Sequence, residues 1–228
     1  VVPIPFGDKS KNSTWKIENR WKIYHATPFK ETAVIDSDML VLNNIAHWKT
    51  TLDKHDVFYT DKVQTYRGDW ADNTHYRKAF RNHNLPNLYA GFHWFKKCDT
   101  AHTFYKWLEL VMNNWELFYG QYAGGKYFQK WPSIDVSSAV VAKILNCEDT
   151  ITSKTTHPTF THMKLKCQGW EKTYVDSWQE QVGTYLDNDC NLKIGNFTQS
   201  GIFHYTEKSF CNKSVVETYE NKLGIKHD

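Results

Sequence analysis

The sequence predicts an α/β protein with a partly parallel sheet. Short apolar runs of strand length alternate with longer segments in which apolar side chains recur at helical spacing, a succession typical of helices layered on a sheet. Hydrophobic residues make up 40% of the 228 residues, which is enough for a substantial core. Because no repeat, low-complexity segment or linker divides the chain, we expect a single domain over residues 1–228.

In the first part of the chain, apolar runs mark the expected strands, and mixed segments mark helices and loops. The strands are Ala33–Ile35, Met39–Leu42 and Val57–Thr60, and the helices are one within Trp15–His25 and one over Asn43–Asp53. The polar stretch Asp61–Asn84 predicts a loop that carries one helix. Its arginines, Arg67, Arg77 and Arg81, are expected to form a solvated face.

The second part of the chain carries stronger helical signals. Gly91 interrupts the aromatic run Leu85–Phe95 and indicates a bulge or a close backbone approach. Further helices are expected at Ala101–Tyr119, capped by Asp99 or Thr100, and at Val136–Leu145, Trp170–Leu186 and Val215–Leu223. Further strands are expected at Thr159–Cys167, Leu192–Ile194 and Gly201–Tyr205.

Charge and cysteine content limit the class of protein. The net charge of +3 is by itself too small to indicate a nucleic-acid partner. The five cysteines are odd in number and show no metal-ligand spacing, which favours free thiols in a reducing compartment, and we expect a cytoplasmic protein. No apolar stretch is long enough to span a membrane, and Val1–Pro5 lacks the basic region of a signal peptide.

Two carboxylates, Asp36 and Asp38, lie between the apolar runs Ala33–Ile35 and Met39–Leu42. Carboxylates are costly to bury unless a cation or several donors lie beside them. Residues two apart in an extended chain point to the same side, so both could reach one divalent cation at the end of a strand. Oxygen ligands suit Mg²⁺ or Mn²⁺, which share their coordination with phosphate oxygens. The alternative is an ordinary polar turn after a strand.

Four blocks of the sequence, taken in order, resemble glycogenin-like glycosyltransferases. Pro28–Val41 is similar to the segment in which a strand ends in Asp-x-Asp. Asn87–Phe95 is similar to the block that lines the donor sugar, and Ser133–Asp135 to a helix start whose acidic residue faces that sugar. Ile202–Phe210 is similar to a late His-x-x-x-Lys block. The ordered set is more specific than any single block.

The resemblance implies a GT-A fold, a Rossmann-like mixed sheet flanked by helices, that binds a nucleoside-diphosphate sugar. By this analogy the metal ligands are Asp36, Asp38 and His204, the catalytic residues are Asp135 and Lys208, and the donor-binding residues are Tyr89, Gly91 and Lys208. The departing diphosphate gains negative charge, which Mn²⁺ or Mg²⁺ and a lysine would neutralise. Only Val1–Phe6 precedes the first loop, so we expect the amino-terminal nucleotide-binding part to be shortened.

We therefore expect a metal-dependent hexosyltransferase that uses a nucleoside-diphosphate donor, UDP above all, and acts on an acceptor hydroxyl. The resemblance implies retention at the anomeric carbon, and the lack of an obvious general base suits a front-face reaction in which the leaving phosphate takes the proton. The acceptor is either a glycan or a hydroxymethylated pyrimidine in DNA, as for enzymes of phage or bacterial type. The second acceptor would require base flipping and phosphate contacts.

Two other classes of function stay open. The first is a non-catalytic nucleotide-sugar or carbohydrate-binding domain on a degenerate transferase scaffold. The second, a metal-dependent nuclease or phosphatase, would need more clustered carboxylates. Taken singly, His204 would be a structural strand residue, Lys208 a solvated lysine and Asp135 a helix cap. His157 and His162 are interpreted as structural or acceptor-side residues.

Overall fold

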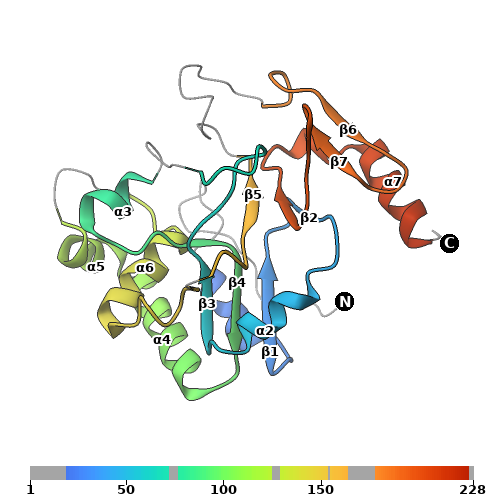
Figure 1. Cartoon of the computed structure of the whole chain (residues 1–228). Coiled ribbons are helices and arrows are strands. Elements are labelled where there is room, and N and C mark those ends of the chain that lie inside the picture. Colours follow the sequence, from blue (N-terminus) through green and yellow to red (C-terminus); the bar gives the residue numbers. More distant parts are fainter. Residues whose placement is uncertain (1–18, 72–76, 125–128, 154, 164–177, 226–228) are drawn as a thin grey trace. The chain divides into compact units, whose positions relative to one another are not determined.

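The computed structural model describes residues 19–71, 77–124, 129–153, 155–163 and 178–225 (Figure 1). The chain folds into two compact units, each made of separate stretches of sequence. Unit 1 takes residues 1–34, 50–61 and 75–157, and unit 2 takes residues 35–49, 62–74 and 158–228. The expected strand end at Val1–Phe6, and with it the shortened amino-terminal part, lies outside the described residues.

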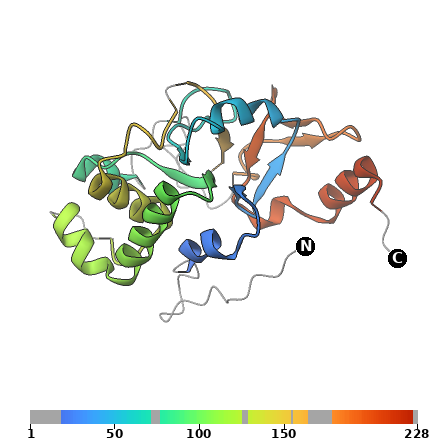
Figure 2. The same cartoon turned by 90° about the horizontal axis from the view of Figure 1, so that it is seen from below.

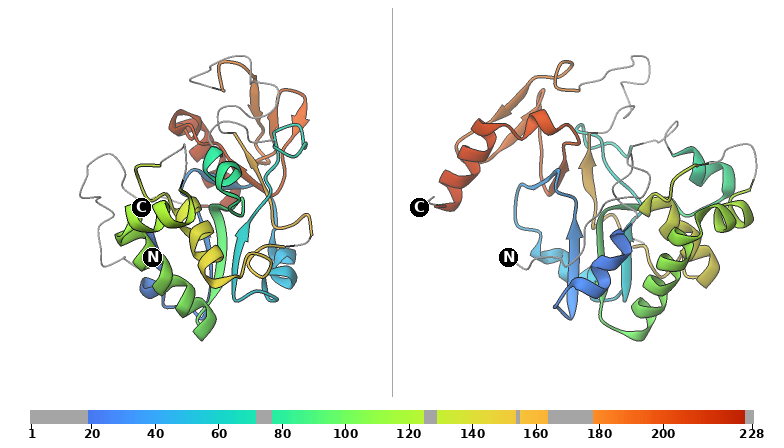
Figure 3. Two further views of the ribbon diagram at one scale, coloured as in Figure 1. Left: turned by 90° about the vertical axis from the view of Figure 1, so that its left-hand side faces the viewer. Right: turned by 180° about the vertical axis from the view of Figure 1, so that it is seen from behind.

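Unit 1 is built around a three-stranded sheet in the order β1 (Glu31–Ile35), β4 (Tyr89–Lys96), β3 (Val57–Thr60), with β3 and β4 antiparallel. Its helical elements are η1 (Arg20–Lys22), α1 (Ile23–Ala26), α2 (Lys49–Leu52), α3 (Lys78–His83), α4 (Asp99–Asn113), α5 (Trp115–Tyr122) and α6 (Ile134–Leu145). Helix α4 packs against α6 and β3, and α6 also packs against β4 (Figure 3). Phe104, Leu108 and Val140 are fully buried in the resulting core.

The segment expected as a single helix over Ala101–Tyr119 is two helices. Helix α4 ends at Asn113 and α5 begins at Trp115, with Asn114 outside helical geometry at φ −123°. The Asn114 side chain donates from Nδ2 to the carbonyl of Leu110 at 2.9 Å. The amide of Asn114 keeps its helical hydrogen bond to the same carbonyl at 3.1 Å, so the break is a local change of backbone angle at Asn114, and the apolar periodicity continues across it.

Helices α4 and α6 both begin earlier in the sequence than expected, at Asp99 and Ile134. Cys98, rather than Asp99 or Thr100, occupies the cap position of α4 and makes no side-chain cap hydrogen bond. Helix α6 begins at Ile134, before the expected start at Val136, and its cap is Ser133, whose Oγ accepts a hydrogen bond from the amide of Val136 at 3.4 Å. This cap begins the helical turn that carries Asp135.

Strand β4 contains the irregularity that Gly91 predicts. Tyr59 lies opposite His93, whereas the next residue of β3, Thr60, lies opposite Tyr89. The residues of β4 between these two pairs, with Gly91 at their centre, therefore bulge out of the ladder. The prediction of a bulge at this glycine is confirmed.

The bulge also holds a buried neutral histidine. His93 donates from Nδ1 to the carbonyl of Ala90 at 2.8 Å, and its ring lies parallel to the ring of Tyr59 with centroids 5.0 Å apart. Burial lowers the pKa of His93 from 6.5 to about 4. In the unfolded chain the same side chain gains its proton near pH 6.5. The unfolded state therefore binds more protons than the native state between these two values, and the native state loses stability as pH falls through that window.

We expect His93 alone to lower the free energy of unfolding by about 3 kcal/mol between pH 7 and pH 4. In His93→Phe, which keeps a ring against Tyr59, this part of the pH dependence should disappear. Urea unfolding of His93→Phe and of the parent protein at a series of pH values measures the difference. Equal slopes for His93→Phe and the parent would contradict the assignment.

The described part of unit 2 contains two small three-stranded sheets. The first has the order β2 (Met39–Val41), β9 (Ile202–His204), β5 (Phe160–His162), with β2 antiparallel and β5 parallel to β9. The second is antiparallel and consists of β6 (Thr184–Leu186), β7 (Leu192–Ile194) and β8 (Phe197–Thr198). The helical elements are η2 (Ala46–Trp48), η3 (Lys208–Phe210) and α7 (Lys213–Leu223), the red helix of Figure 2. The fold is thus mixed α/β with mostly antiparallel pairing.

The helix expected over Trp170–Leu186 is wrong for the part that the structure describes. Turns lead instead into strand β6. In the loop after β6, Asp187 Oδ1 accepts hydrogen bonds from the amides of Asp189 and Asn191, both at 2.9 Å. This turn returns the chain into β7 as a hairpin, so local turn chemistry overrides the helical spacing of the apolar residues.

The other expected elements are found, some in shorter form. The helix expected over Asn43–Asp53 is found as η2 followed by α2, and Oδ1 of Asn44, just before it, accepts a hydrogen bond from the amide of Ala46 at 2.8 Å. The strand expected over Thr159–Cys167 is described as far as residue 163 and supplies β5. In the described parts of the chain, each helix is too short or too polar to cross a membrane, and the four cysteines are free thiols.

Candidate metal site

Pairing of β2 with β9 brings three potential metal ligands of unit 2 together. His204 is the last residue of β9 and lies opposite Met39, the first residue of β2. Asp38 immediately precedes β2, and its carbonyl accepts a hydrogen bond from the amide of Tyr205 at 3.1 Å. Asp36 lies two residues earlier. The antiparallel register therefore carries the aspartates to the imidazole, although they are far apart in sequence.

The segment that carries both carboxylates is a turn rather than the end of an extended strand. Strand β1 ends at Ile35, and the amide of Met39 donates to the carbonyl of Asp36 at 3.1 Å, which closes a β-turn. The local geometry is that of the polar turn considered as the alternative. The two carboxylates nevertheless converge, because the turn delivers them to the same end of β9.

Asp36, Asp38 and His204 form a cluster that could hold a metal ion. One ligand atom from each residue lies within 4.8 Å of the other two. Asp38 Oδ1 and His204 Nε2 are 3.1 Å apart. His204 is buried and both aspartates are half-buried. Two carboxylates with one imidazole fit a divalent cation that accepts both oxygen and nitrogen ligands.

The second nitrogen of the His204 ring faces another histidine. His204 Nδ1 lies 3.0 Å from Nδ1 of His162, which is also buried. The two residues are opposite each other in the parallel pairing of β5 with β9. Sequence reasoning gave His162 only a structural or acceptor-side role. The signal that identifies it is the register of two strands distant in sequence, and no local pattern contains that register.

After β9 the chain turns and presents Lys208. Thr206 has a φ of 59°, a left-handed conformation uncommon for a β-branched residue, and its hydroxyl donates to the carbonyl of Met163 at 3.1 Å. Glu207 Oε2 accepts a hydrogen bond from Gln179 Nε2 at 2.7 Å. These contacts hold the turn, and Lys208, which is exposed, begins η3 directly after it.

Tyr205 ties this turn to the aspartate segment. Its hydroxyl donates to the carbonyl of Ser37 at 3.3 Å. Burial, the contact with the Cys211 thiol and the negative charge of Asp38 together raise the pKa of Tyr205 to about 12. The phenol therefore stays protonated at neutral pH and remains a donor to the turn between the two carboxylates.

In unit 1, Asp135 is held through both of its carboxylate oxygens. Its Oδ2 lies 2.6 Å from Nη1 of Arg77, and its Oδ1 accepts a hydrogen bond from the amide of Ala90 at 2.9 Å. The Asp135 side chain remains 27% exposed, whereas that of Arg77 is 2% exposed. Asp135 therefore links α6 to β4 and keeps an exposed side that a ligand could reach.

Arg77 does not belong to a solvated face, and that expectation is wrong. Its guanidinium also donates to Asn87 Oδ1 at 2.8 Å and to the carbonyl of Leu88. The rings of Phe80 and Tyr89 lie 3.8 and 4.0 Å from the guanidinium carbon. A charged group this deeply buried is stable only when it is paired and hydrogen-bonded, and Arg77 is both.

Two candidate donor-binding residues, Tyr89 and Gly91, lie in the same buried region. Tyr89 is 3% exposed and its ring covers the guanidinium of Arg77. Gly91 is buried within the bulge of β4. The contacts described for these two residues are internal to unit 1, and their role toward a donor stays a prediction.

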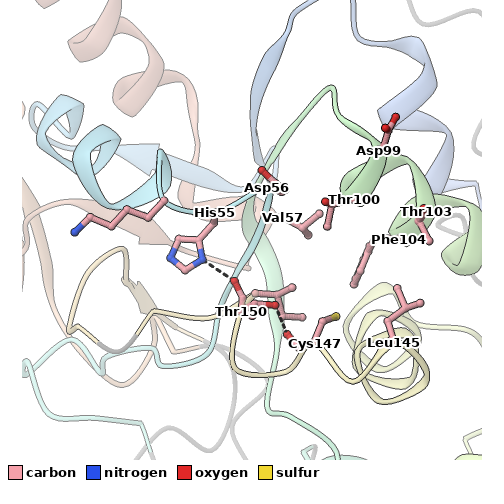
Figure 4. A pocket seen from close by; sticks show the side chains of 12 residues that line it. His55, Asp56, Val57, Asp99, Thr100, Thr103, Phe104, Leu145, Cys147 and Thr150 are labelled. Carbon is pink, nitrogen blue, oxygen red and sulfur yellow. Dashed lines mark hydrogen bonds between the residues drawn. The ribbon is translucent and has the colours of Figure 1, made fainter.

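A cavity of about 590 Å³ lies elsewhere in unit 1 (Figure 4). Val57 of β3, Phe104 of α4 and Leu145 of α6 give it an apolar lining, as Figure 4 shows. At its edge His55 donates from Nδ1 to the carbonyl of Thr150 at 2.7 Å. The site residues predicted from the sequence do not line this cavity.

No family model matches the sequence, and comparison with curated proteins and with solved structures found no match either.

Proposed function

We propose that the protein is a metal-dependent glycosyltransferase that moves a hexose from a nucleoside-diphosphate donor, with UDP as the first candidate, onto an acceptor hydroxyl. The observation that carries this proposal is the convergence of Asp36 and Asp38 with His204. These residues come from the first and the last of the four blocks that resemble glycogenin-like glycosyltransferases. A GT-A arrangement of the fold is part of the same proposal.

Each candidate residue has a chemical role in this proposal. Asp36, Asp38 and His204 would hold Mn²⁺, because an imidazole among the ligands favours Mn²⁺ over Mg²⁺. A divalent cation held there would supply positive charge to offset the negative charge that develops on the departing diphosphate. Lys208 adds a second positive charge for the same group. Asp135 accepts hydrogen bonds from the transferred sugar through the exposed part of its carboxylate.

The acceptor in this proposal is a glycan hydroxyl or the hydroxymethyl group of a modified pyrimidine in DNA. The new bond from the acceptor oxygen to the anomeric carbon forms on the face from which the diphosphate leaves, so the configuration is retained. The departing phosphate oxygen takes the proton of the acceptor hydroxyl. This route requires positioning and charge neutralisation from the protein rather than a separate general base.

The test is to incubate the full chain with UDP-hexoses and to follow the release of UDP with and without Mn²⁺. We expect release only with Mn²⁺, and faster release when a glycan or hydroxymethylated DNA is added. Binding of the nucleotide-sugar without cleavage, whichever acceptor is present, would instead support the non-catalytic binding domain. Failure to bind any nucleotide-sugar would contradict both the transferase and a nucleotide-sugar-binding domain.

Lys208→Ala should lower turnover by roughly 10²-fold, because its charge acts mainly when the phosphate departs. Binding of Mn²⁺ should remain close to that of the parent, since Lys208 is not a ligand. Single-turnover kinetics and calorimetry measure the two effects separately. Lys213→Ala is the matched control, because the Lys213 side chain is 88% exposed and lies near Lys208 in sequence. Equal turnover of the two variants would exclude a role for Lys208 in the reaction.

A further inference from the structure

We propose that His162 is a positioning residue for the metal site, which orients the His204 ring so that Nε2 faces the cation. This proposal rests on the proposed metal site but not on the transferase reaction. The contact that carries it is the 3.0 Å separation of the two Nδ1 atoms. That contact occupies Nδ1 of His204. The other ring nitrogen, Nε2, lies 3.1 Å from Asp38 Oδ1 and is therefore the atom directed at the metal site.

The strand register fixes the two rings relative to each other. Strands β5 and β9 are parallel neighbours, and His162 lies opposite His204. The two ring centroids are 4.7 Å apart with planes inclined by 36°. The preceding pair in the register, Thr161 and Phe203, lies on the other side of the sheet because side chains alternate along strands. The contact between the imidazoles is therefore set by the backbone of the sheet.

The hydrogen bond between the two rings can run in either direction, and that property suits a metal ligand. Without a cation, His204 can donate from Nε2 to Asp38 and accept at Nδ1 from His162. With a cation, Nε2 must offer its lone pair, so Nδ1 carries the proton and donates to His162. An imidazole at position 162 serves both arrangements, because Nδ1 is a donor in one neutral tautomer and an acceptor in the other.

Water is a poor substitute for His162 at this position. His162 is 5% exposed and His204 is 8% exposed. The ring of Phe160 packs against both, with centroids 5.7 Å from His162 and 5.8 Å from His204. In this enclosed, largely apolar setting, loss of the His162 ring leaves Nδ1 of His204 without a replacement partner.

The test compares two amide substitutions in the full chain. The side-chain oxygen and nitrogen of asparagine can occupy the place of Nδ1, whereas those of glutamine lie farther along the side chain, near the place of Nε2. Titration with Mn²⁺ alone should give His162→Asn an affinity within a few-fold of the parent. His162→Gln and His162→Leu should bind Mn²⁺ about 10–100-fold more weakly. Thr161→Val, a buried isosteric change on the same strand, should bind like the parent.

Thermal unfolding in EDTA separates positioning from stability. We expect His162→Asn and His162→Gln to unfold at similar temperatures while their Mn²⁺ affinities differ. Parent-like affinity of His162→Gln would overturn the proposal, and so would equal losses in the two amide variants. A parent protein that does not bind Mn²⁺ would overturn it together with the metal site. A parent that binds Mn²⁺ but never cleaves a nucleotide-sugar would end the proposed function alone.

Discussion

Asp38→Ala should abolish sugar transfer, with a loss on the order of 10³-fold or more, because a divalent cation supplies several kcal/mol of charge stabilisation in such reactions. Asp36→Ala should act in the same way, since it also removes one of the three ligands. The fold should persist, because the carbonyl of Asp38, not its side chain, accepts the hydrogen bond from Tyr205. EDTA should abolish turnover by the parent protein, and added Mn²⁺ should restore that turnover. Initial rates of UDP release and Mn²⁺ calorimetry measure both effects.

Asp189→Ala provides the matched control for these variants. Asp189 belongs to the same unit, and its side chain is 76% exposed and paired with Lys222 at the surface. Because exposed ion pairs contribute little, this variant should bind Mn²⁺ and turn over like the parent. Full turnover of the parent in excess EDTA, or normal turnover of Asp38→Ala, would remove the metal from the proposed reaction.

Asp135→Ala should destabilise the protein by about 3–5 kcal/mol, because it leaves the buried guanidinium of Arg77 without its carboxylate. It also removes the acceptor for the amide of Ala90. Asp135→Asn should cost less, since its side-chain oxygen can still accept one of these hydrogen bonds. Urea unfolding of the two variants and the parent measures the difference. Asp149→Ala, an exposed change in the same unit, should unfold close to the parent.

The same variants separate the structural role of Asp135 from its proposed catalytic role. If Asp135→Ala unfolds like Asp149→Ala, the ion pair with Arg77 does not stabilise the fold. An Asp135→Asn protein that stays folded and binds donor, yet loses turnover, would support the catalytic role proposed for this carboxylate. Unchanged turnover in that variant would restrict Asp135 to its structural contacts.

Elements with a strong local signal could be predicted from the sequence. The bounds of β3 and β7 agree with the expected strands Val57–Thr60 and Leu192–Ile194, because each is a short apolar run between polar segments. The body of α6 was predicted, but its start was placed too late because the cap at Ser133 was not recognised. The break at Asn114 was missed because the apolar periodicity continues across it. The β6–β7 hairpin was missed because an Asx turn at Asp187 outweighs helical periodicity. No linker in the sequence marks the division into two units. The chain first passes from unit 1 to unit 2 at the end of β1, within a regular strand.

The candidate site could be predicted only in part. Asp36 and Asp38 stand out because carboxylates within apolar runs are costly to bury. His204 could be connected with them only through the resemblance, since no local pattern relates residues so distant in sequence. His162 depends on the parallel register of two strands, and its sequence context gave no indication of it. Arg77 was misjudged because the polar stretch around it gives no sign of its burial. The ring that covers its guanidinium is that of Tyr89, which belongs to β4.

The strand order of the first sheet of unit 2 has a consequence for biosynthesis. β9 lies between β2 and β5 and is the last of the described strands to leave the ribosome. Until it emerges, β2 and β5 lack the partner to which each is hydrogen-bonded in this sheet. Pairing β9 with β2 and with β5 closes the long loops that separate these strands in sequence. Closing such loops costs conformational entropy, and long-range pairing is slow. The cation site therefore assembles late, after translation has passed His204. A cation that binds only the assembled site would favour this final step of folding.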